Sequence, residues 1–553
     1  MPVLFENLDG AASYHLLHGE ERVRLAQVLN PQRVEAYRCT YDLGGESFEY
    51  QYAAKAISDA ILGRLQELAD EQDLIAKYRM ILGGEIMNTG EGRMVLHHLC
   101  RGDFAAGSGR GGTRTGTEAI PAVVHEGRSL REFYEAQRAR FSSFAERVLA
   151  GRITGADGSR FASVVQIGIG GSDLGPRALL LALEGVEYEY DGRRRRGAML
   201  ETRFLSNVDP DDAAAALAGL DPRSTLFIIV SKSGTTQETL TNEAFALQWL
   251  AGGGVKEPRR QIVCVTSETS PLARSGDYLD SFFIDDFIGG RYSSSSAVGG
   301  TVLSLAYGPE VFAGILAGAH EADRAALEPS ITDNPALLDA LIGVYERNVL
   351  GYPATAVLPY SQALVRFPAH LQQLDMESNG KRVNREGRPV GYATGPVIFG
   401  EPGTNGQHSF YQLLHQGTDV VPLQFVGFAE PQQGTDITFQ GSTSQAKLNA
   451  NLVAQIVAFA LGKTDSNPNR FFPGERPSSL LWAHRLTPRV LGGLLAHYEN
   501  KVMFQGLTWN LNSFDQEGVQ LGKMLTNQVL GPGDLDPVLA AYARRYAARP
   551  ARA

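Results

Sequence analysis

The chain has 553 residues, of which 43% are hydrophobic and 20% are charged, and its formal net charge at pH 7 is −10. This is an ordinary globular balance, and the length predicts two to four structural units. The acidic balance argues against nucleic acid as the main partner, because phosphate backbones need a concentrated basic surface.

Cysteine usage and hydropathy exclude several further classes. Three cysteines, Cys39, Cys100 and Cys264, are too few for a disulfide framework, and none has the spacing of a zinc site. We therefore expect reduced thiols, no metal and no other cofactor. The first ten residues do not resemble a signal peptide, and no apolar run reaches the length of about 18 residues that a membrane span needs. We expect a cytoplasmic protein without membrane contact.

The first part of the chain, residues 1–125, reads as a mostly helical N-terminal region that packs on the second domain. It ends in a glycine-rich extended loop at about 107–121. From 126 to 304, short runs rich in Val, Ile and Phe alternate with helical patterns, which is typical of βαβ units around a parallel sheet. The predicted strands lie at 163–171, 202–208, 224–232, 261–267 and 280–286.

The same alternation returns from 305 to 515. It predicts strands at 355–360, 395–404 and 420–428 and helices at 361–380, 408–417 and 442–462. Residues 516–553 read as a C-terminal helical arm. The sequence thus predicts an α/β protein with two parallel-sheet domains, 126–304 and 305–515.

The basic run Arg193–Arg196 lies between two glycines in the first of these domains. We interpret it as a solvated loop. A polyanion site is the alternative.

A strand that ends in a cluster of hydroxyl side chains gives the strongest chemical signal. Residues 228–242 run from apolar sequence into Ser231, Lys232, Ser233, Gly234, Thr235 and Thr236, and a helical pattern follows. Free N–H groups at a helix start bind phosphate, and hydroxyls add hydrogen bonds. A simple Ser/Thr cap would need only one hydroxyl, so we favour a phosphate site.

Glycine-rich turns elsewhere do not predict a nucleotide site. The turn at 166–175 also follows a strand, but Asp173 stands where a dinucleotide fingerprint needs glycine. The spacing does occur at Gly107, Gly109 and Gly112, where neither strand nor helix flanks it. We interpret that match as chance.

Candidate acid–base groups occur at predicted helix and loop junctions. Glu377 ends a helical pattern beside the turn signal Asn379–Gly380, and His408 stands where a Gly/Pro/Asn loop meets a helix. Arg291 follows a strand, and Lys523 ends the segment 509–523. Each of these residues alone could equally be structural or solvated.

Taken together, these segments resemble the phosphoglucose isomerase family. The resemblance rests on long motifs at 88–102, 167–176, 231–242, 289–293, 376–381, 400–417 and 512–523, which follow the family's order over nearly the whole chain. It implies two sugar-isomerase domains, a homodimer with active sites at the subunit interface, and interconversion of glucose 6-phosphate and fructose 6-phosphate in glycolysis and gluconeogenesis.

The resemblance also implies roles for single residues. Glu377 is the expected isomerisation base, Arg291 faces the enediolate, and Lys523 and His408 act in ring opening, the latter donated by the partner subunit. The residues expected to bind substrate are Gly171, Ser172, Ser231, Lys232, Ser233, Thr236 and Gln373. Three alternatives stay open: a non-catalytic sugar-phosphate sensor, a nicotinamide-dependent dehydrogenase, and a wider substrate range that includes mannose 6-phosphate.

Overall fold

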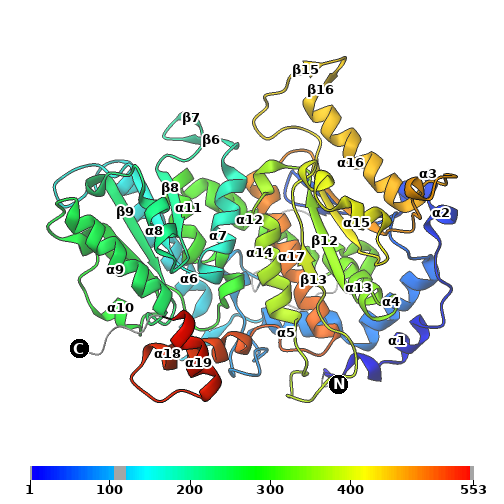
Figure 1. Cartoon of the computed structure of the whole chain (residues 1–553), viewed down its shortest axis with the longest axis horizontal. Coiled ribbons are helices and arrows are strands. Elements are labelled where there is room, and N and C mark those ends of the chain that lie inside the picture. The colour runs from blue at the N-terminus through cyan, green and yellow to red at the C-terminus, as the bar shows by residue number, and fades with distance from the viewer. Residues whose placement is uncertain (1–2, 105–119, 548–553) are drawn as a thin grey trace.

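The computed structural model describes residues 3–104 and 120–547, which form two lobes, each around a mainly parallel sheet (Figure 1). The first lobe is the five-stranded sheet with its helices, and the second lobe is the six-stranded sheet with its helices. Most of the predicted glycine-rich loop, including Gly107, Gly109 and Gly112, lies outside the described residues.

In the first lobe every neighbouring pair of strands is parallel, and the strand order is β11-β10-β9-β5-β8. These are the five strands that the sequence predicted for this region. Every residue of β9 is buried, as expected for a parallel strand covered by helices on both faces. The strands are β5 Ser163–Ile167, β8 Glu201–Leu205, β9 Thr225–Val230, β10 Ile262–Thr266 and β11 Asp280–Phe283. The helices around this sheet are α6 Leu130–Leu149, α7 Leu174–Leu183, α8 Pro210–Leu217, α9 Gln237–Gly252, α10 Pro271–Arg274 and α11 Ala297–Tyr307.

In the second lobe the strand order is β1-β2-β17-β14-β12-β13, with four parallel strands and an antiparallel hairpin, β1–β2, at one edge. The strands are β1 Arg38–Asp42, β2 Ser47–Gln51, β12 Ala354–Pro359, β13 Val397–Phe399, β14 Leu423–Phe428 and β17 Ser478–Ala483. The three strands predicted here correspond to β12, β13 and β14. β17 and the β1–β2 hairpin were not predicted. Through this hairpin, part of the N-terminal region joins the second sheet.

Helices of the second lobe and of the N-terminal region cover this sheet (Figure 1). They are α1 Ala12–Leu17, α2 Leu25–Val28, α3 Pro31–Ala36, α4 Asp59–Glu71, α5 Leu74–Leu82, α12 Pro309–Ala325, α13 Pro335–Asn348, α14 Phe367–Leu371, α15 Tyr411–Gln416, α16 Ser444–Leu461 and α17 Pro488–Thr508. The long helix predicted over 361–380 is instead α14 followed by a π-helical turn, Gln372–Glu377. Two small hairpins, β3 Val124–His125 with β4 Arg128–Ser129 and β15 Thr438–Phe439 with β16 Ser442–Thr443, lie outside the main sheets.

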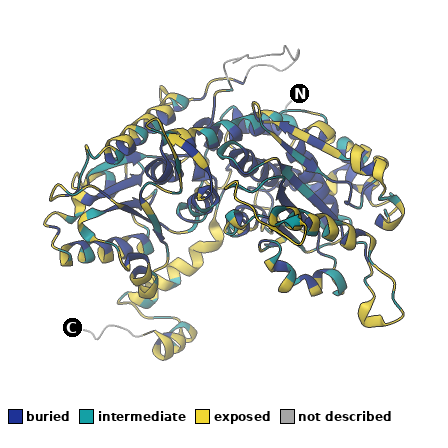
Figure 2. Cartoon of the chain, turned by 90° about the horizontal axis from the view of Figure 1, so that it is seen from above, coloured by how far each residue is buried: buried dark blue, intermediate teal, exposed yellow. Residues whose placement is uncertain are grey.

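Helix α17 is buried along almost its whole length, and Figure 2 shows the buried interior of both lobes in dark blue. Its buried charged side chains are paired, as burial of charge requires. Arg101 of the N-terminal region forms ion pairs with Glu499 on α17 and Asp323 on α12, which join that region to the two helices. On the same helix, Lys501 lies 2.9 Å from Asp339 of α13.

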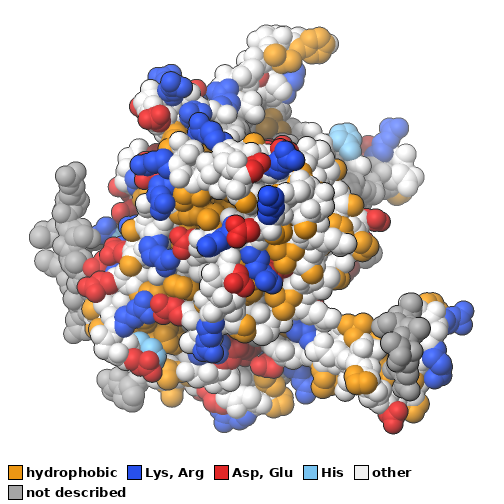
Figure 3. All heavy atoms as spheres, turned by 90° about the vertical axis from the view of Figure 1, so that its left-hand side faces the viewer, with side chains coloured by type: hydrophobic (Ala, Val, Ile, Leu, Met, Phe, Trp, Pro, Cys, Tyr) orange, Lys and Arg blue, Asp and Glu red, His pale blue; other side chains and the backbone are white. Residues whose placement is uncertain are grey.

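The basic run Arg193–Arg196 forms strand β7 of an exposed hairpin with β6, Glu187–Tyr190, and is not a loop. Glu187 lies opposite Arg196 in this hairpin, and Glu189 lies opposite Arg194. The glutamates therefore offset part of the positive charge of the arginines, and Glu187 forms ion pairs with Arg194 and Arg196. Basic and acidic side chains are likewise interspersed on the face of the first lobe shown in Figure 3.

The last two helices of the described residues, α18 Gln520–Leu530 and α19 Pro537–Tyr546, lie below the first lobe in Figure 1. The predicted division between the domains, at residue 304, falls inside the fully buried helix α11. Among the described residues, no helix is long and apolar enough to cross a membrane.

Candidate active site

The hydroxyl cluster that the sequence singled out connects the end of β9 to the start of α9. Ser231 Oγ accepts a hydrogen bond from the Gly234 amide at 3.2 Å and lies 3.0 Å from Thr236 Oγ1. Ser233 Oγ accepts from the Thr235 amide at 3.2 Å. The segment folds back on itself at the positive end of a helix dipole, and this arrangement suits a phosphate dianion.

Lys232 gives this cradle a positive charge. Its ammonium donates to the Ile288 carbonyl oxygen at 3.2 Å and lies 4.0 Å from Asp286. Burial lowers the pKa of Lys232, and the nearby Asp286 carboxylate acts in the opposite direction. A bound anion would further favour the charged ammonium.

The glycine turn after β5 brings a second backbone segment close to the cradle. A Cβ atom on Gly171 would lie 2.1 Å from the Gly290 carbonyl oxygen and 2.8 Å from the Arg291 amide nitrogen. Only glycine permits this approach. The glycine turn therefore packs against the backbone at Gly290–Arg291 and fixes the position of the Arg291 Cα atom.

The Arg291 guanidinium connects the two lobes at this point. Its Nη1 lies 3.2 Å from Glu377 Oε2, and its Nε donates to Ser378 Oγ at 2.7 Å. The Arg291 side chain is 1% exposed, whereas the Glu377 side chain is 20% exposed. The cation is thus fixed below the surface, and the carboxylate at the end of the π-helical turn reaches solvent.

Gln373, one turn before Glu377, has an unused hydrogen-bond acceptor. Its amide nitrogen would lie 3.1 Å from a Cβ on Gly170, so the side chain sits against the glycine turn of the first lobe. Its Oε1 is buried and has no hydrogen-bond partner within the described residues. A sugar hydroxyl could donate to that atom.

One cleft between the lobes, with a volume of about 1410 Å³, brings ten of the eleven predicted site residues together. They are Gly171, Ser172, Ser231, Lys232, Ser233, Thr236, Arg291, Gln373, Glu377 and Lys523. Lys523 reaches the cleft from α18. The carboxyl ends of β5 and β9 open onto the cleft, where ligands bind in parallel α/β sheets.

His408 is the predicted residue that does not line this cleft. It ends a short 3₁₀ turn, Asn405–His408, and is exposed. The neighbouring His415 is a structural histidine, because its ring stacks on Phe459 with ring centroids 3.7 Å apart.

Several residues around Arg291 and Lys232 belong to the site but were not among the predicted site residues. In the segment 88–93, Asn88, Glu91 and Arg93 line the cleft. The loop 512–516 contacts Arg291 through main-chain oxygens. Both segments belong to motifs that carried the family resemblance. These motifs were the signal in the sequence that could have identified the two segments as part of the site. Their contacts with Arg291 and the cleft depend on the tertiary structure. Three or more metal-ligating side chains do not cluster anywhere in the described part of the chain.

Comparison with known proteins gives one consistent result. The family described as phosphoglucose isomerase matches residues 51–538. The glucose-6-phosphate isomerase of Treponema pallidum is 57% identical over 542 residues, covering 98% of each chain. That of Borreliella burgdorferi is 43% identical over 543 residues, again 98% of each. A crystal structure of a glucose-6-phosphate isomerase from Chlamydia trachomatis superposes with a TM-score of 0.87 at 40% identity, covering 98% of this chain and 99% of the other. This chain therefore belongs to the phosphoglucose isomerase family.

Proposed function

We propose that this chain interconverts D-glucose 6-phosphate and D-fructose 6-phosphate by moving a proton between C2 and C1 of the open-chain sugar. The observation that supports this most directly is that one cleft contains both an anion cradle and a carboxylate–guanidinium pair. Relatives that match nearly the whole chain carry the same activity in their names.

Glu377 is the proposed base. Its carboxylate takes the C2 proton, the C–H electron pair forms a double bond between C1 and C2, and the C1 carbonyl oxygen becomes negative. Arg291 lies beside this carboxylate and stabilises the developing enediolate charge at a site where it is itself shielded from water. The proton then returns to C1 while the O2 hydroxyl proton moves to O1, which leaves a ketone at C2.

The phosphate binds far from the reacting carbons and supplies orientation. Hydroxyls of Ser231, Ser233 and Thr236, the α9 N-terminus and Lys232 form the cradle on the first lobe. Glu377 comes from the second lobe. Binding energy gained at the phosphate therefore aligns C1 and C2 with a base on a separate element.

Ring opening needs a second pair of groups, for which we propose Lys523 and His408. Lys523 lines the cleft, but His408 lies outside it, so His408 would come from the partner subunit of a homodimer. Exposed apolar side chains recur on α16 at Val453, Val457 and Leu461, with exposed fractions of 56%, 45% and 42%. Such a stripe on an α/β protein fits a subunit interface.

A coupled assay tests the proposed activity: fructose 6-phosphate is supplied, and glucose 6-phosphate is detected by an added dehydrogenase. We expect the chain to convert fructose 6-phosphate without using nicotinamide, which only the added dehydrogenase consumes. A folded chain that binds fructose 6-phosphate without converting it would instead be a sensor. Nicotinamide reduction without the added dehydrogenase would identify a dehydrogenase. Mannose 6-phosphate in the same assay measures substrate range. We place the reaction in glycolysis and gluconeogenesis in the cytoplasm.

A further inference from the structure

Besides its contacts with Glu377 and Ser378, the buried Arg291 guanidinium is held by two main-chain oxygens of a distant loop. Its Nη2 donates to the Ser513 carbonyl oxygen at 2.6 Å and to the Asp515 carbonyl oxygen at 2.9 Å. Because carbonyl groups move with the backbone, the position of the guanidinium depends on the conformation of the loop 513–515.

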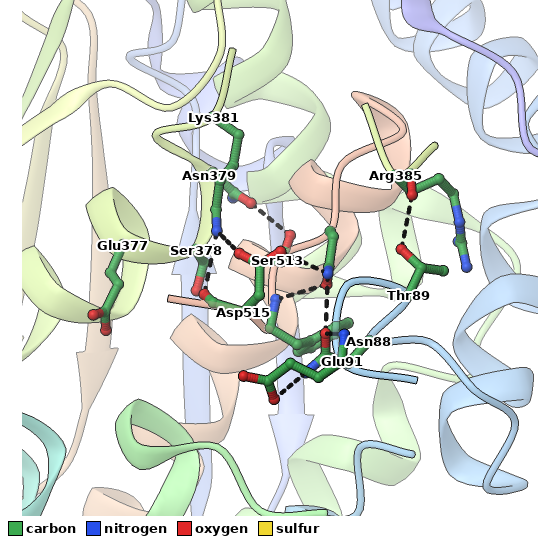
Figure 4. A network of polar contacts seen from close by, with 12 residues as sticks. Asn88, Thr89, Glu91, Glu377, Ser378, Asn379, Lys381, Arg385, Ser513 and Asp515 are labelled. Carbon is green, nitrogen blue, oxygen red and sulfur yellow. Dashed lines mark hydrogen bonds and ion pairs between the residues drawn. The ribbon is translucent and has the colours of Figure 1, made fainter. Parts of the chain in front are cut away.

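An ion pair helps to fix that loop. The Lys381 ammonium pairs with the Asp515 carboxylate and also donates to the Asp515 carbonyl oxygen at 3.2 Å. Lys381 and Arg291 therefore converge on the same carbonyl oxygen. Asp515 Oδ2 in turn accepts from the Asn512 side chain at 2.8 Å, so both carboxylate oxygens are occupied (Figure 4).

Neutral hydrogen bonds support the same loop from two further segments. Ser513 Oγ donates to Asn379 at 2.7 Å, and Asn512 donates to Asn88 at 3.0 Å. In Figure 4 Asn88, Asn379 and Ser513 lie to the right of Glu377, whose carboxylate points away from them. Within this network Asn88 also lines the cleft, whereas Asn379 and Ser513 do not.

We propose that Lys381 and Asp515 are positioning residues for the isomerisation, which set the alignment of the Arg291 guanidinium with the Glu377 carboxylate. Lys381 follows Glu377 by four positions, and Asp515 precedes the helix that carries Lys523. The pair thus joins the segment of the base to the loop that holds Arg291. This inference rests on the proposed function.

The location of the pair separates its effect from substrate binding. Neither side chain lines the cleft, and the two are 17% and 16% exposed. The phosphate cradle at 231–236 lies on the first lobe, and among the described residues no hydrogen bond or ion pair joins it to Lys381 or Asp515. Loss of the pair should therefore weaken transition-state stabilisation and leave ground-state binding nearly intact.

The test compares wild type with Lys381→Met, Lys381→Arg and Lys256→Met. Methionine keeps the length of the lysine stem and removes its charge; arginine retains the charge and can still pair with Asp515. Lys256 is an exposed lysine in the first lobe, so its substitution controls for the general effect of replacing lysine with methionine. Each protein is assayed for kcat and KM and for affinity toward two ligands. One is an open-chain hexitol 6-phosphate, which mimics bound substrate, and the other is a five-carbon hydroxamate phosphate, whose planar anionic end mimics the enediolate.

We expect Lys381→Met to lower kcat by about 100-fold, the size of effect that a misplacement of about 1 Å produces. Affinity for the hydroxamate should fall in parallel, whereas affinity for the hexitol phosphate should stay within about threefold. Lys381→Arg should recover most of kcat, and Lys256→Met should match wild type.

Two results would overturn the inference. One is a kcat within about threefold of wild type in folded Lys381→Met. The other is an equal loss of affinity for both ligands, which would show a general structural role. If Lys381→Met does not fold, Asp515→Asn decides, because it removes the charge from the other side of the same ion pair. A selective loss of hydroxamate affinity in Asp515→Asn supports the inference, and an equal loss for both ligands, or no loss, contradicts it. A wild-type chain without turnover would instead remove the proposed function itself.

Discussion

The Arg291 guanidinium lies 3.2 Å from the Glu377 carboxylate, although 86 positions separate them in the sequence. Arg291 is held by the backbone after the five-stranded sheet, and Glu377 by the π-helical turn of the second lobe. The reacting pair therefore exists only when both lobes are folded and in contact.

Substitution of Gly171 by alanine should damage catalysis without touching a catalytic side chain. The added Cβ would lie 2.1 Å from the Gly290 carbonyl oxygen and must displace the backbone before Arg291. We expect kcat to fall by about 100-fold. Gly252→Ala is the matched control, because a Cβ there meets nothing within 4 Å. Steady-state kinetics of both variants, with circular dichroism to verify folding, makes the comparison; equal kcat values would contradict the proposed packing.

The phosphate cradle predicts an effect on KM. Ser233→Ala removes one hydroxyl from the Ser231–Thr236 segment. A hydrogen bond to a charged group contributes about 1.5–3 kcal/mol, so KM for fructose 6-phosphate should rise roughly tenfold or more. Ser275→Ala, at an exposed serine, should leave KM unchanged. An unchanged KM in Ser233→Ala would remove this hydroxyl from the phosphate site.

The proposed donation of His408 by the partner subunit can be tested by mixing two inactive variants. His408→Ala and Glu377→Gln are unfolded together and refolded as a mixture. If each site takes Glu377 from one chain and His408 from the other, every mixed dimer contains one intact site. About a quarter of wild-type activity should then return, because about half of the dimers are mixed. If both residues act within one chain, every site carries a lesion and no activity returns.

A separate measurement addresses the chemical role of His408. The His408→Ala variant should lose far more activity on cyclic substrate than on an analogue that cannot close its ring, because general acid–base help is needed only for ring opening. Equal losses on the two substrates would exclude that role.

Asp375, two positions before Glu377, predicts a pH dependence of stability. Burial raises the pKa of its carboxyl from 3.8 to about 7, the Lys501 ammonium acts to lower the pKa, and the Asp339 carboxylate acts to raise it. Because the folded state holds this proton more tightly than the unfolded state, the stabilisation is complete below about pH 4 and is lost as pH rises through about 7. The loss amounts to at most about 4 kcal/mol.

Asp375→Asn keeps the shape of the side chain and removes the titration. Urea midpoints of wild type and this variant, measured from about pH 4 to pH 8, should diverge as pH rises, with the variant the more stable at pH 8. A constant difference between the two proteins across that range would contradict the titration of Asp375 in the folded state.

Strong local signals made most of the sheet strands predictable. In the first lobe β5, β9 and β10 are short, wholly buried runs rich in β-branched residues, whereas β8 and β11 are only partly buried. Hydropathy identified all five. The β1–β2 hairpin carried a different signal that went unused. Cys39 and Tyr41 alternate with exposed residues along β1, Phe48 and Tyr50 lie on the buried face of β2, and the pair Gly44–Gly45 stands between the strands.

Other features could not come from the sequence without the fold. β17 reads Ser-Ser-Leu-Leu-Trp-Ala, and its buried serines weaken the apolar signal. The π-helical turn that carries Gln373 and Glu377 replaces a helix that the periodicity favoured. The loop 513–515 accepts hydrogen bonds from Arg291 through main-chain oxygens, and such contacts cannot be predicted from the residue types of the loop. Side-chain chemistry suggested which groups act, whereas their alignment depends on backbone contacts.

Hydrogen exchange at C2 tests the central claim most directly. Wild type and Glu377→Gln are incubated with glucose 6-phosphate in deuterated water, and deuterium at C2 is followed by NMR while binding of a hexitol 6-phosphate is measured in parallel. We expect rapid exchange in wild type and, in Glu377→Gln, exchange slowed by at least about 1,000-fold with nearly normal binding. Exchange at close to the wild-type rate in Glu377→Gln would show that another group removes the proton.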